Sequence, residues 1–177
     1  MPLYIIRHTS VNVSKSVCYG QSDVDLATTF EEEANAVLAQ LPEKIDFIFS
    51  SDLLRCVRLS EKIKQKYDVE ISMDKRLREM NFGDWEMKNW DDIPPSELDV
   101  WMNNFVFEKA KNGENLTILS QRIGSFLQEI NEKFDTKKNI VIVTHAGAIR
   151  AFLHHIKGIA LKDVFNTKVN YGEIFIL

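Results

Sequence analysis

The sequence predicts an α/β protein, a three-layer α/β/α sandwich with a mostly parallel central sheet. Two observations predict this class: short apolar runs alternate with longer amphipathic segments, and the run Ile140–Val143 has no polar alternation. Such alternation is typical of a parallel sheet covered by helices, and an uninterrupted apolar run indicates a strand buried on both faces. At 177 residues the chain has the size of one domain, so we expect a single domain over residues 1–177.

The strands are expected at five short apolar runs, which are residues 3–6, 47–49, 69–73, 140–143 and 174–177. Between them, apolar residues recur at the i, i+3, i+4, i+7 spacing of an amphipathic helix. Four such stripes cover residues 34–41, 98–105, 119–134 and 149–156. Gly158 is well placed to end the last helix in the left-handed conformation. A further helix is expected after Ser51, with Ser50, Ser51 and Asp52 as its N-cap cluster.

Composition excludes several classes of protein. The 22 Lys and Arg against 26 Asp and Glu give a net charge of −4, and no window forms a basic stripe, so nucleic acid is not expected as a partner. Cys18 and Cys56 lie far apart without CxxC spacing, which excludes a zinc ribbon or a disulfide scaffold. No apolar run approaches the roughly 18 residues of a membrane span. We therefore expect a soluble, cytoplasmic protein with no membrane partner.

Charged and polar side chains follow four of the predicted strands. Arg7 and His8 come after the first, Arg55 shortly after the second, Glu79 after the third and His145 after the fourth. In parallel sheets, ligands bind beyond the carboxyl ends of the strands. We therefore expect these five side chains to meet at one edge of the sheet.

This set of residue types suits phosphoryl transfer through a histidine. A neutral imidazole is a good nucleophile at pH 7, because its unperturbed pKa is roughly 6.5. Guanidinium groups bind phosphoryl oxygens in pairs of hydrogen bonds, and a carboxyl group can protonate the leaving oxygen. Each residue also has a structural interpretation: a histidine at a strand end is commonly hydrogen-bonded, and Arg55 with Arg58 can form a solvated helix face. The coincidence of four separate segments favours the chemical interpretation.

Four motifs in this order resemble those of the histidine phosphatase superfamily, over nearly the whole chain. They are Arg7-His8, Ser50-Ser51-x-Leu53-x-Arg55, Leu77-Arg78-Glu79 with Phe82-Gly83-x-Trp85-Glu86, and Thr144-His145-Ala146-Gly147. The resemblance implies the phosphoglycerate-mutase-like fold. Within the superfamily, residues 18–26 and 78–86 look most like α-ribazole phosphatases.

The resemblance also implies roles for the site residues. His8 would be the catalytic nucleophile that becomes phosphorylated, and Glu79 the catalytic proton donor. Arg7 and Arg55 would bind the phosphate, and His145 would be catalytic while also holding phosphoryl oxygens. No metal and no cofactor are implied.

A loop of substrate-contacting residues departs from the family pattern. The family usually has Gly and then Glu or Gln after Arg-His, where this chain has Thr9 and Ser10, and often an Asn where it has Ser14. Thr9 carries a Cβ, so its backbone approaches a phosphate less freely than glycine would. We expect Thr9, Ser14 and Gln21 to belong to the substrate loop.

The function that follows is a metal-independent phosphomonoesterase acting on a small-molecule phosphate ester, with α-ribazole 5′-phosphate as the expected substrate. Three alternatives stay open. They are a broad-specificity sugar or protein phosphatase, a phosphoglycerate mutase, and a catalytically inactive module that binds phosphorylated ligands.

Other conspicuous residues are interpreted structurally. His154 and His155 are expected at a partly exposed helix end, without metal-ligand spacing. Cys18 and Cys56 are interpreted as ordinary small residues. Most of the aromatic side chains after Glu79 are expected in the core, and one or two are candidates for the floor of the leaving-group pocket. These aromatic residues are Trp85, Trp90, Trp101, Phe105 and Phe107.

Overall fold

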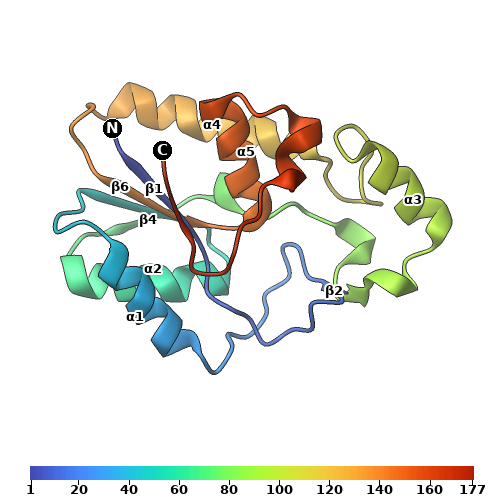
Figure 1. The fold of residues 1–177 in the computed structure, drawn as a ribbon, viewed down its shortest axis with the longest axis horizontal. Helices are drawn as coiled ribbons and strands as arrows, with labels where there is room; N and C mark the ends of the chain where they lie inside the picture. Colours follow the sequence, from blue (N-terminus) through green and yellow to red (C-terminus); the bar gives the residue numbers. More distant parts are fainter.

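A computed structural model describes all residues from 1 to 177. Its centre is a five-stranded sheet in the order β4-β3-β6-β1-β7 (Figure 1). Four strands run parallel, and β7 pairs antiparallel with β1. The strands are β1 (Leu3–Arg7), β3 (Phe47–Ser50), β4 (Ile71–Met73), β6 (Ile140–Thr144) and β7 (Ile174–Ile176).

Helices cover both faces of this sheet, which confirms the three-layer α/β/α prediction. Figure 1 shows α1 and α2 below the strands and α4 and α5 above them. One apolar core joins α1 and α2 to the sheet through Val141 and Val143, and a second joins α4 and α5 through Ile140 and Ile142. The helices are α1 (Phe30–Gln40), α2 (Leu54–Tyr67), α4 (Leu116–Lys133) and α5 (Ala146–Lys157).

The strand β6 is the middle strand of the sheet, and all five of its residues are buried. Its apolar run therefore has the two-sided burial expected of a central parallel strand. Its register with β1 pairs Leu3 with Ile140 and ends by pairing Arg7 with Thr144. Both strands consequently stop at the same level, and the residues that follow them are neighbours.

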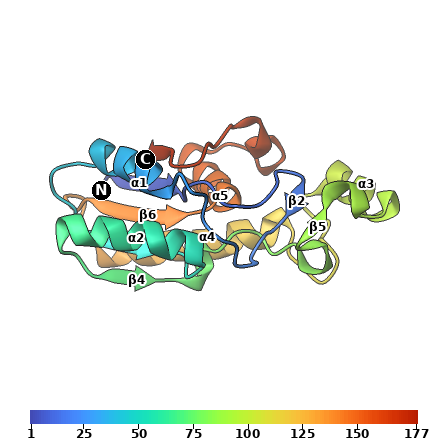
Figure 2. The same ribbon diagram turned by 90° about the horizontal axis from the view of Figure 1, so that it is seen from below.

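A smaller arm extends beyond the carboxyl ends of the strands (Figure 2). It contains a two-stranded sheet, in which β2 (Val17–Cys18) pairs antiparallel with β5 (Lys88–Asn89), and the helix α3 (Pro95–Asn104). The remaining regular elements are 3₁₀ turns. They are Lys75–Leu77, Gly83–Trp85, Trp90–Asp92 and Leu161–Asn166.

The helix ends confirm one prediction and correct another. Gly158 has φ 71° and ends α5 in the left-handed conformation, with its N–H donating to the His154 carbonyl. The predicted N-cap cluster before α2 is wrong, because no side chain from residues 50–52 caps the helix well. Instead Asp23 accepts a 2.8 Å hydrogen bond from the Leu54 N–H. A carboxylate 31 positions earlier in the chain thus satisfies this helix N-terminus.

Several element boundaries also move, and two of them have a clear local reason. The strand predicted at residues 69–73 begins only at Ile71, because Asp68 ends α2 with φ 52° and the chain must turn first. The helix predicted at 98–105 begins at Pro95, a residue type suited to the first helical turn. None of the helices combines the length and the apolar character that crossing a membrane would require.

Candidate active site

The matched ends of β1 and β6 place two histidines side by side. His8 and His145 each follow the last residue of their strand, and the His8 N–H donates to the Thr144 carbonyl at 3.0 Å. Their ring centroids are 5.2 Å apart. His8 is 1% exposed and His145 is fully buried. The matched strand ends thus bring the two histidines together.

A hydrogen bond assigns the tautomer of His8. Its Nδ1 lies 2.7 Å from the carbonyl oxygen of Thr9, which can only accept, so Nδ1 carries the proton. Burial, and then the charges of Arg55 and Arg7, hold the pKa of His8 well below its usual value. His8 is therefore neutral at pH 7, and its Nε2 carries a free lone pair.

His145 has both ring nitrogens occupied. Its Nδ1 accepts from Nε of Arg55 at 3.2 Å, so the proton is on Nε2, which donates to the Ser51 hydroxyl at 2.8 Å. Burial first, then Arg55, lowers the pKa of His145 well below its usual value. The Cys56 sulfur lies 3.4 Å from the same Nε2. Burial raises the pKa of this thiol, so Cys56 stays protonated.

Arg55 is the largest side chain that is fully buried. Its three nitrogens all donate: Nε to His145, one terminal nitrogen to the Ser22 carbonyl at 2.8 Å and the other to the Gly20 carbonyl at 2.6 Å. No carboxylate forms an ion pair with it. Its full positive charge thus stays available beside the histidines.

Arg7 carries the second guanidinium of the site. It donates to the Val169 carbonyl at 2.7 Å, and its carbon Cζ lies 3.8 Å from the ring centroid of Tyr171. The N–H at its Nε is buried without a partner. A buried donor left unpaired costs free energy, and an anion held by Arg7 would remove that cost.

Glu79 is fixed at the N-terminus of α5. Its carboxylate accepts from the Gly147 N–H at 3.1 Å and from its neighbour Met80 at 2.8 Å. A Cβ at position 147 would overlap the Glu79 carboxylate, so a larger residue there would push this carboxylate aside. The Glu79 carbonyl accepts from Gln21 at 2.9 Å and from Arg122 at 2.8 Å.

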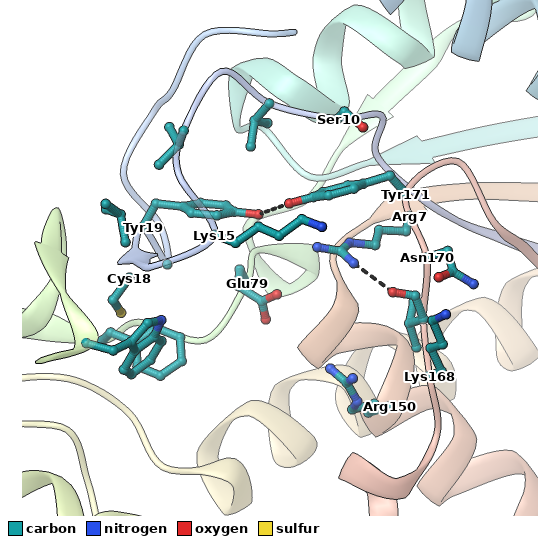
Figure 3. Close-up of a pocket in the computed structure, with 17 residues that line it drawn as sticks. Arg7, Ser10, Lys15, Cys18, Tyr19, Glu79, Arg150, Lys168, Asn170 and Tyr171 are labelled. Carbon is teal, nitrogen blue, oxygen red and sulfur yellow. Dashed lines mark hydrogen bonds between the residues drawn. The ribbon is translucent and has the colours of Figure 1, made fainter. Parts of the chain in front are cut away.

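These residues adjoin a cavity of about 630 Å³ (Figure 3). Arg7 and Glu79 line it, whereas His8, Arg55 and His145 lie beneath its surface. Tyr19 and Tyr171 close the site from above, with their hydroxyls 3.0 Å apart and the Tyr171 ring 5.5 Å from that of His8. His8 therefore has almost no contact with solvent beneath this tyrosine pair.

The cavity lining contains two chemically different sets of side chains. Val13, Val17, Cys18, Phe82 and Trp90 belong to the apolar set. Arg7, Lys15, Arg150 and Lys168 form the cationic set. Of the aromatic candidates, Trp90 lines the cavity, while Trp85 and Trp101 are core residues and Phe107 is 69% exposed.

The three expected loop residues lie outside the cavity wall. Thr9 is fully buried and its hydroxyl has no partner. Ser14 faces solvent and pairs with the Ser16 hydroxyl at 2.9 Å. Gln21 instead ties the Glu79 backbone to the loop before α1. The neighbouring Lys15, rather than Ser14, reaches the cavity.

The sequence reasoning missed both tyrosines and the three outer cations. Tyr171, Lys168 and Arg150 come from the last 30 residues, where no spacing or motif singled them out. Only their closeness to β7 and to the start of α5, two elements at the active edge, offered a signal.

The remaining histidines have structural partners. His155 Nε2 lies 3.0 Å from the Ser120 hydroxyl, and its ring packs against Gly124. His154 Nδ1 donates to the Ile159 carbonyl at 2.7 Å. No three His, Cys, Asp or Glu side chains are grouped to hold a metal ion.

Comparisons with known proteins agree with this geometry. The family model described as histidine phosphatase superfamily (branch 1) matches residues 3–177. A candidate phosphoserine phosphatase of Hydrogenobacter thermophilus is 29% identical, over 97% of this chain and 86% of its own length. The adenosylcobalamin/α-ribazole phosphatase of Escherichia coli is 25% identical, over 97% and 87%. The crystal structure of the α-ribazole phosphatase from Shigella flexneri superposes with a TM-score of 0.91 at 24% identity, covering 99% of this chain and 89% of that one.

The family match spans all of the strands and every element that carries the site. The chain therefore belongs to the histidine phosphatase superfamily, branch 1.

Proposed function

We propose that the protein is a metal-independent phosphomonoesterase that works through a phosphohistidine at His8. One observation carries the proposal: the Nδ1 proton of His8 is held by the Thr9 carbonyl, which leaves Nε2 free as a nucleophile beside two guanidinium groups that form no ion pair. The proposal needs the tyrosine pair to open, so that a phosphate ester can pass between Arg7 and Glu79.

In the first step, the Nε2 lone pair of His8 attacks phosphorus. The Nε2–P bond forms, the bond from phosphorus to the ester oxygen breaks, and its electron pair leaves with that oxygen. Glu79 gives its proton to the leaving oxygen, so the product is a neutral alcohol. The Gly147 N–H holds the carboxyl group in place for this transfer.

In the second step, water hydrolyses the phosphohistidine. Glu79, now a carboxylate, takes a proton from the water as its oxygen attacks phosphorus. The Nε2–P bond breaks, its electrons return to the imidazole, and inorganic phosphate leaves. Glu79 and His8 end in the protonation states in which they began.

The cationic groups stabilise both transition states, because charge spreads over the phosphoryl oxygens in each. Arg7 supplies an unpartnered N–H, and Arg55 supplies a buried charge. Because both nitrogens of His145 already have partners, we assign it first to holding Arg55.

For the substrate we propose α-ribazole 5′-phosphate, a small phosphate ester with a planar aromatic base. The apolar part of the cavity lining supports this substrate, since Phe82 and Trp90 offer rings on which such a base can stack. The α-ribazole phosphatases among the relatives support it too. A second candidate is a broad-specificity phosphatase of small anionic esters. The four cations of the cavity lining favour such substrates.

The test measures phosphate release from a panel of monoesters in EDTA, including α-ribazole 5′-phosphate and p-nitrophenyl phosphate. Rapid quenching with ³²P-labelled ester should trap acid-labile, base-stable label on His8, and His8→Ala should abolish both label and turnover. Label on a Ser, Asp or Cys would contradict the mechanism. Isomerisation of 3-phosphoglycerate would indicate a mutase, and no phosphate release a binding module.

A further inference from the structure

Four positively charged side chains line the active-site cavity. They are Arg7, Lys15, Arg150 and Lys168, and Glu79 is the one carboxylate among the lining residues. The whole chain has a net charge of −4, so these four cations are a local excess of positive charge in an acidic protein. In Figure 3 the Lys15 side chain extends toward Arg7, and the Arg150 guanidinium points toward Glu79.

None of these four cations forms an ion pair. Eleven salt bridges occur elsewhere in the molecule, so carboxylates are available to lysines and arginines in general. Arg150 donates only to the Thr167 carbonyl, at 3.2 and 3.3 Å, and lies 5.0 Å from the ring centroid of Phe165. Burial lowers the pKa of Arg150, and the charge of Arg7 lowers it further against the pull of Glu79. No carboxylate neutralises these four cations, so their positive potential acts on a ligand in the cavity.

Hydrolysis of a simple ester leaves part of this charge unused. A phosphate dianion is balanced by Arg7 and Arg55, and Glu79 is uncharged when it acts as the acid. Lys15, Arg150 and Lys168 then face the leaving group with no anion to meet.

We propose that Lys15, Arg150 and Lys168 form a subsite for a second anionic group, a carboxylate or a second phosphate, on the leaving-group side of the substrate. The inference rests on the proposed phosphatase activity and on the second substrate candidate, a small anionic ester. It counts against α-ribazole 5′-phosphate, whose leaving group is neutral. A guanidinium fork binds either anion through paired hydrogen bonds, and the two ammonium groups add charge without fixed geometry.

The helix α5 connects the subsite to the reacting end of the substrate. The Gly147 N–H holds the Glu79 carboxylate, and Arg150 follows three residues later on the same face of the helix. Glu79 and Arg150 both line the cavity.

The test compares pairs of esters that differ by one anionic group. O-phosphoserine and O-phosphoethanolamine differ by a carboxylate, and fructose 1,6-bisphosphate and fructose 6-phosphate differ by a phosphate. We expect kcat/KM to favour the more anionic member of at least one pair by about tenfold, the effect of one charge-assisted hydrogen bond. The pair that shows the preference identifies which anion the subsite takes.

A double variant and a matched control locate the effect. Lys15→Gln with Lys168→Gln should reduce the preference about fivefold or more, mainly by raising KM for the more anionic ester. Lys137→Gln with Lys157→Gln changes net charge equally at two exposed lysines outside the cavity, and should keep the preference. Equal loss in both double variants would overturn the subsite, because the overall field would then explain the preference.

The two proposals can fail separately. Equal kcat/KM within both pairs, with phosphate still released, would overturn the subsite and leave the phosphatase in place. No phosphate release from any of these esters or from p-nitrophenyl phosphate would overturn the phosphatase itself.

Discussion

Arg55 shows how much one side chain does at the centre of the site. Its planar group reaches the Gly20 and Ser22 carbonyls and His145 Nδ1 at the same time, with three different nitrogens. A lysine keeps the charge but offers one nitrogen on a flexible stem. The geometry of this residue, and not its charge alone, therefore holds the loop that carries Tyr19 against the histidines.

We accordingly expect Arg55→Lys to lose nearly as much kcat/KM as Arg55→Ala, about 100-fold or more, the scale of removing one transition-state donor. Steady-state assays with p-nitrophenyl phosphate would measure both variants, and thermal melts would show that each is folded. Recovery of most of the activity by lysine would mean that a point charge suffices.

Glu79→Gln separates acid catalysis from positioning. Glutamine keeps the shape, and its side-chain oxygen can still accept from the Gly147 N–H, but it has no proton to give. With an alkyl phosphate, whose leaving oxygen is strongly basic, the phosphorylation rate should fall by about 100-fold or more. With p-nitrophenyl phosphate, whose leaving group departs as an anion, the loss should be far smaller. Single-turnover kinetics would measure this step, and equal losses on both esters would assign Glu79 to positioning.

At the scale of elements, α4 reaches across to hold the segment that presents Glu79. Arg122 donates to the carbonyls of Arg76 and Arg78, each at 2.6 Å, and to that of Glu79 at 2.8 Å. It also pairs with Glu114 at 3.0 Å. After the 3₁₀ turn Lys75–Leu77 this segment has no regular structure up to Glu79, so the hydrogen bonds of Arg122 fix its path.

Arg122→Met should destabilise the fold by roughly 1–3 kcal/mol, because it leaves three backbone carbonyls without this donor. It should also lower kcat on alkyl phosphates more than on p-nitrophenyl phosphate, since Glu79 loses its position. Urea unfolding and the same pair of esters would measure this. As a control, Arg58→Met breaks an exposed pair with Glu61 and should change stability by less than about 1 kcal/mol. A similar loss in both variants would contradict the positioning role.

The strand ends were predictable from sequence because one rule governs them. Parallel strands that start in register also finish in register, so Arg7 and Thr144 pair and the next residues meet. The cap of α2 was not predictable in this way, because Asp23 is distant in sequence and nothing in residues 50–52 refers to it. Lys15 and Lys168 reach the cavity from irregular loops, where no periodicity indicates which way a side chain points.

At the scale of the whole molecule, the sheet separates two apolar cores and ends in a buried ionisable site. His8 and His145 lie under Tyr171 and Tyr19 at one end of both layers, almost without solvent contact. Burial and the nearby arginines hold the pKa of each imidazole well below its usual value. At a pH where both histidines are protonated in the unfolded chain, folding must release these two protons. This release costs free energy.

This cost predicts a pH window for stability. Above about pH 6.5 the unfolded chain has neutral histidines as well, so they cost nothing. As the pH falls below that value, the histidines of the unfolded state bind protons that those of the native state do not bind. The free energy of unfolding therefore decreases. Each histidine contributes a slope of up to about 1.4 kcal/mol per pH unit. Carboxylates such as Asp52, whose pKa is lowered by Arg78, contribute only nearer their ordinary pKa of about 4.

Urea unfolding at pH 7.5, 6.5, 5.5 and 5.0 would measure the slope. Wild type should lose stability steeply from pH 6.5 to 5.0, and His8→Gln should lose less by up to about 1.4 kcal/mol per pH unit, since glutamine cannot titrate. His145→Gln should flatten the same window, although its stability at pH 7.5 will be lower because Arg55 loses an acceptor. If wild type and both variants lose stability in parallel across this window, the two imidazoles are protonated inside the folded site. His8 would then be a cation at mildly acidic pH, with no lone pair on Nε2 to attack phosphorus.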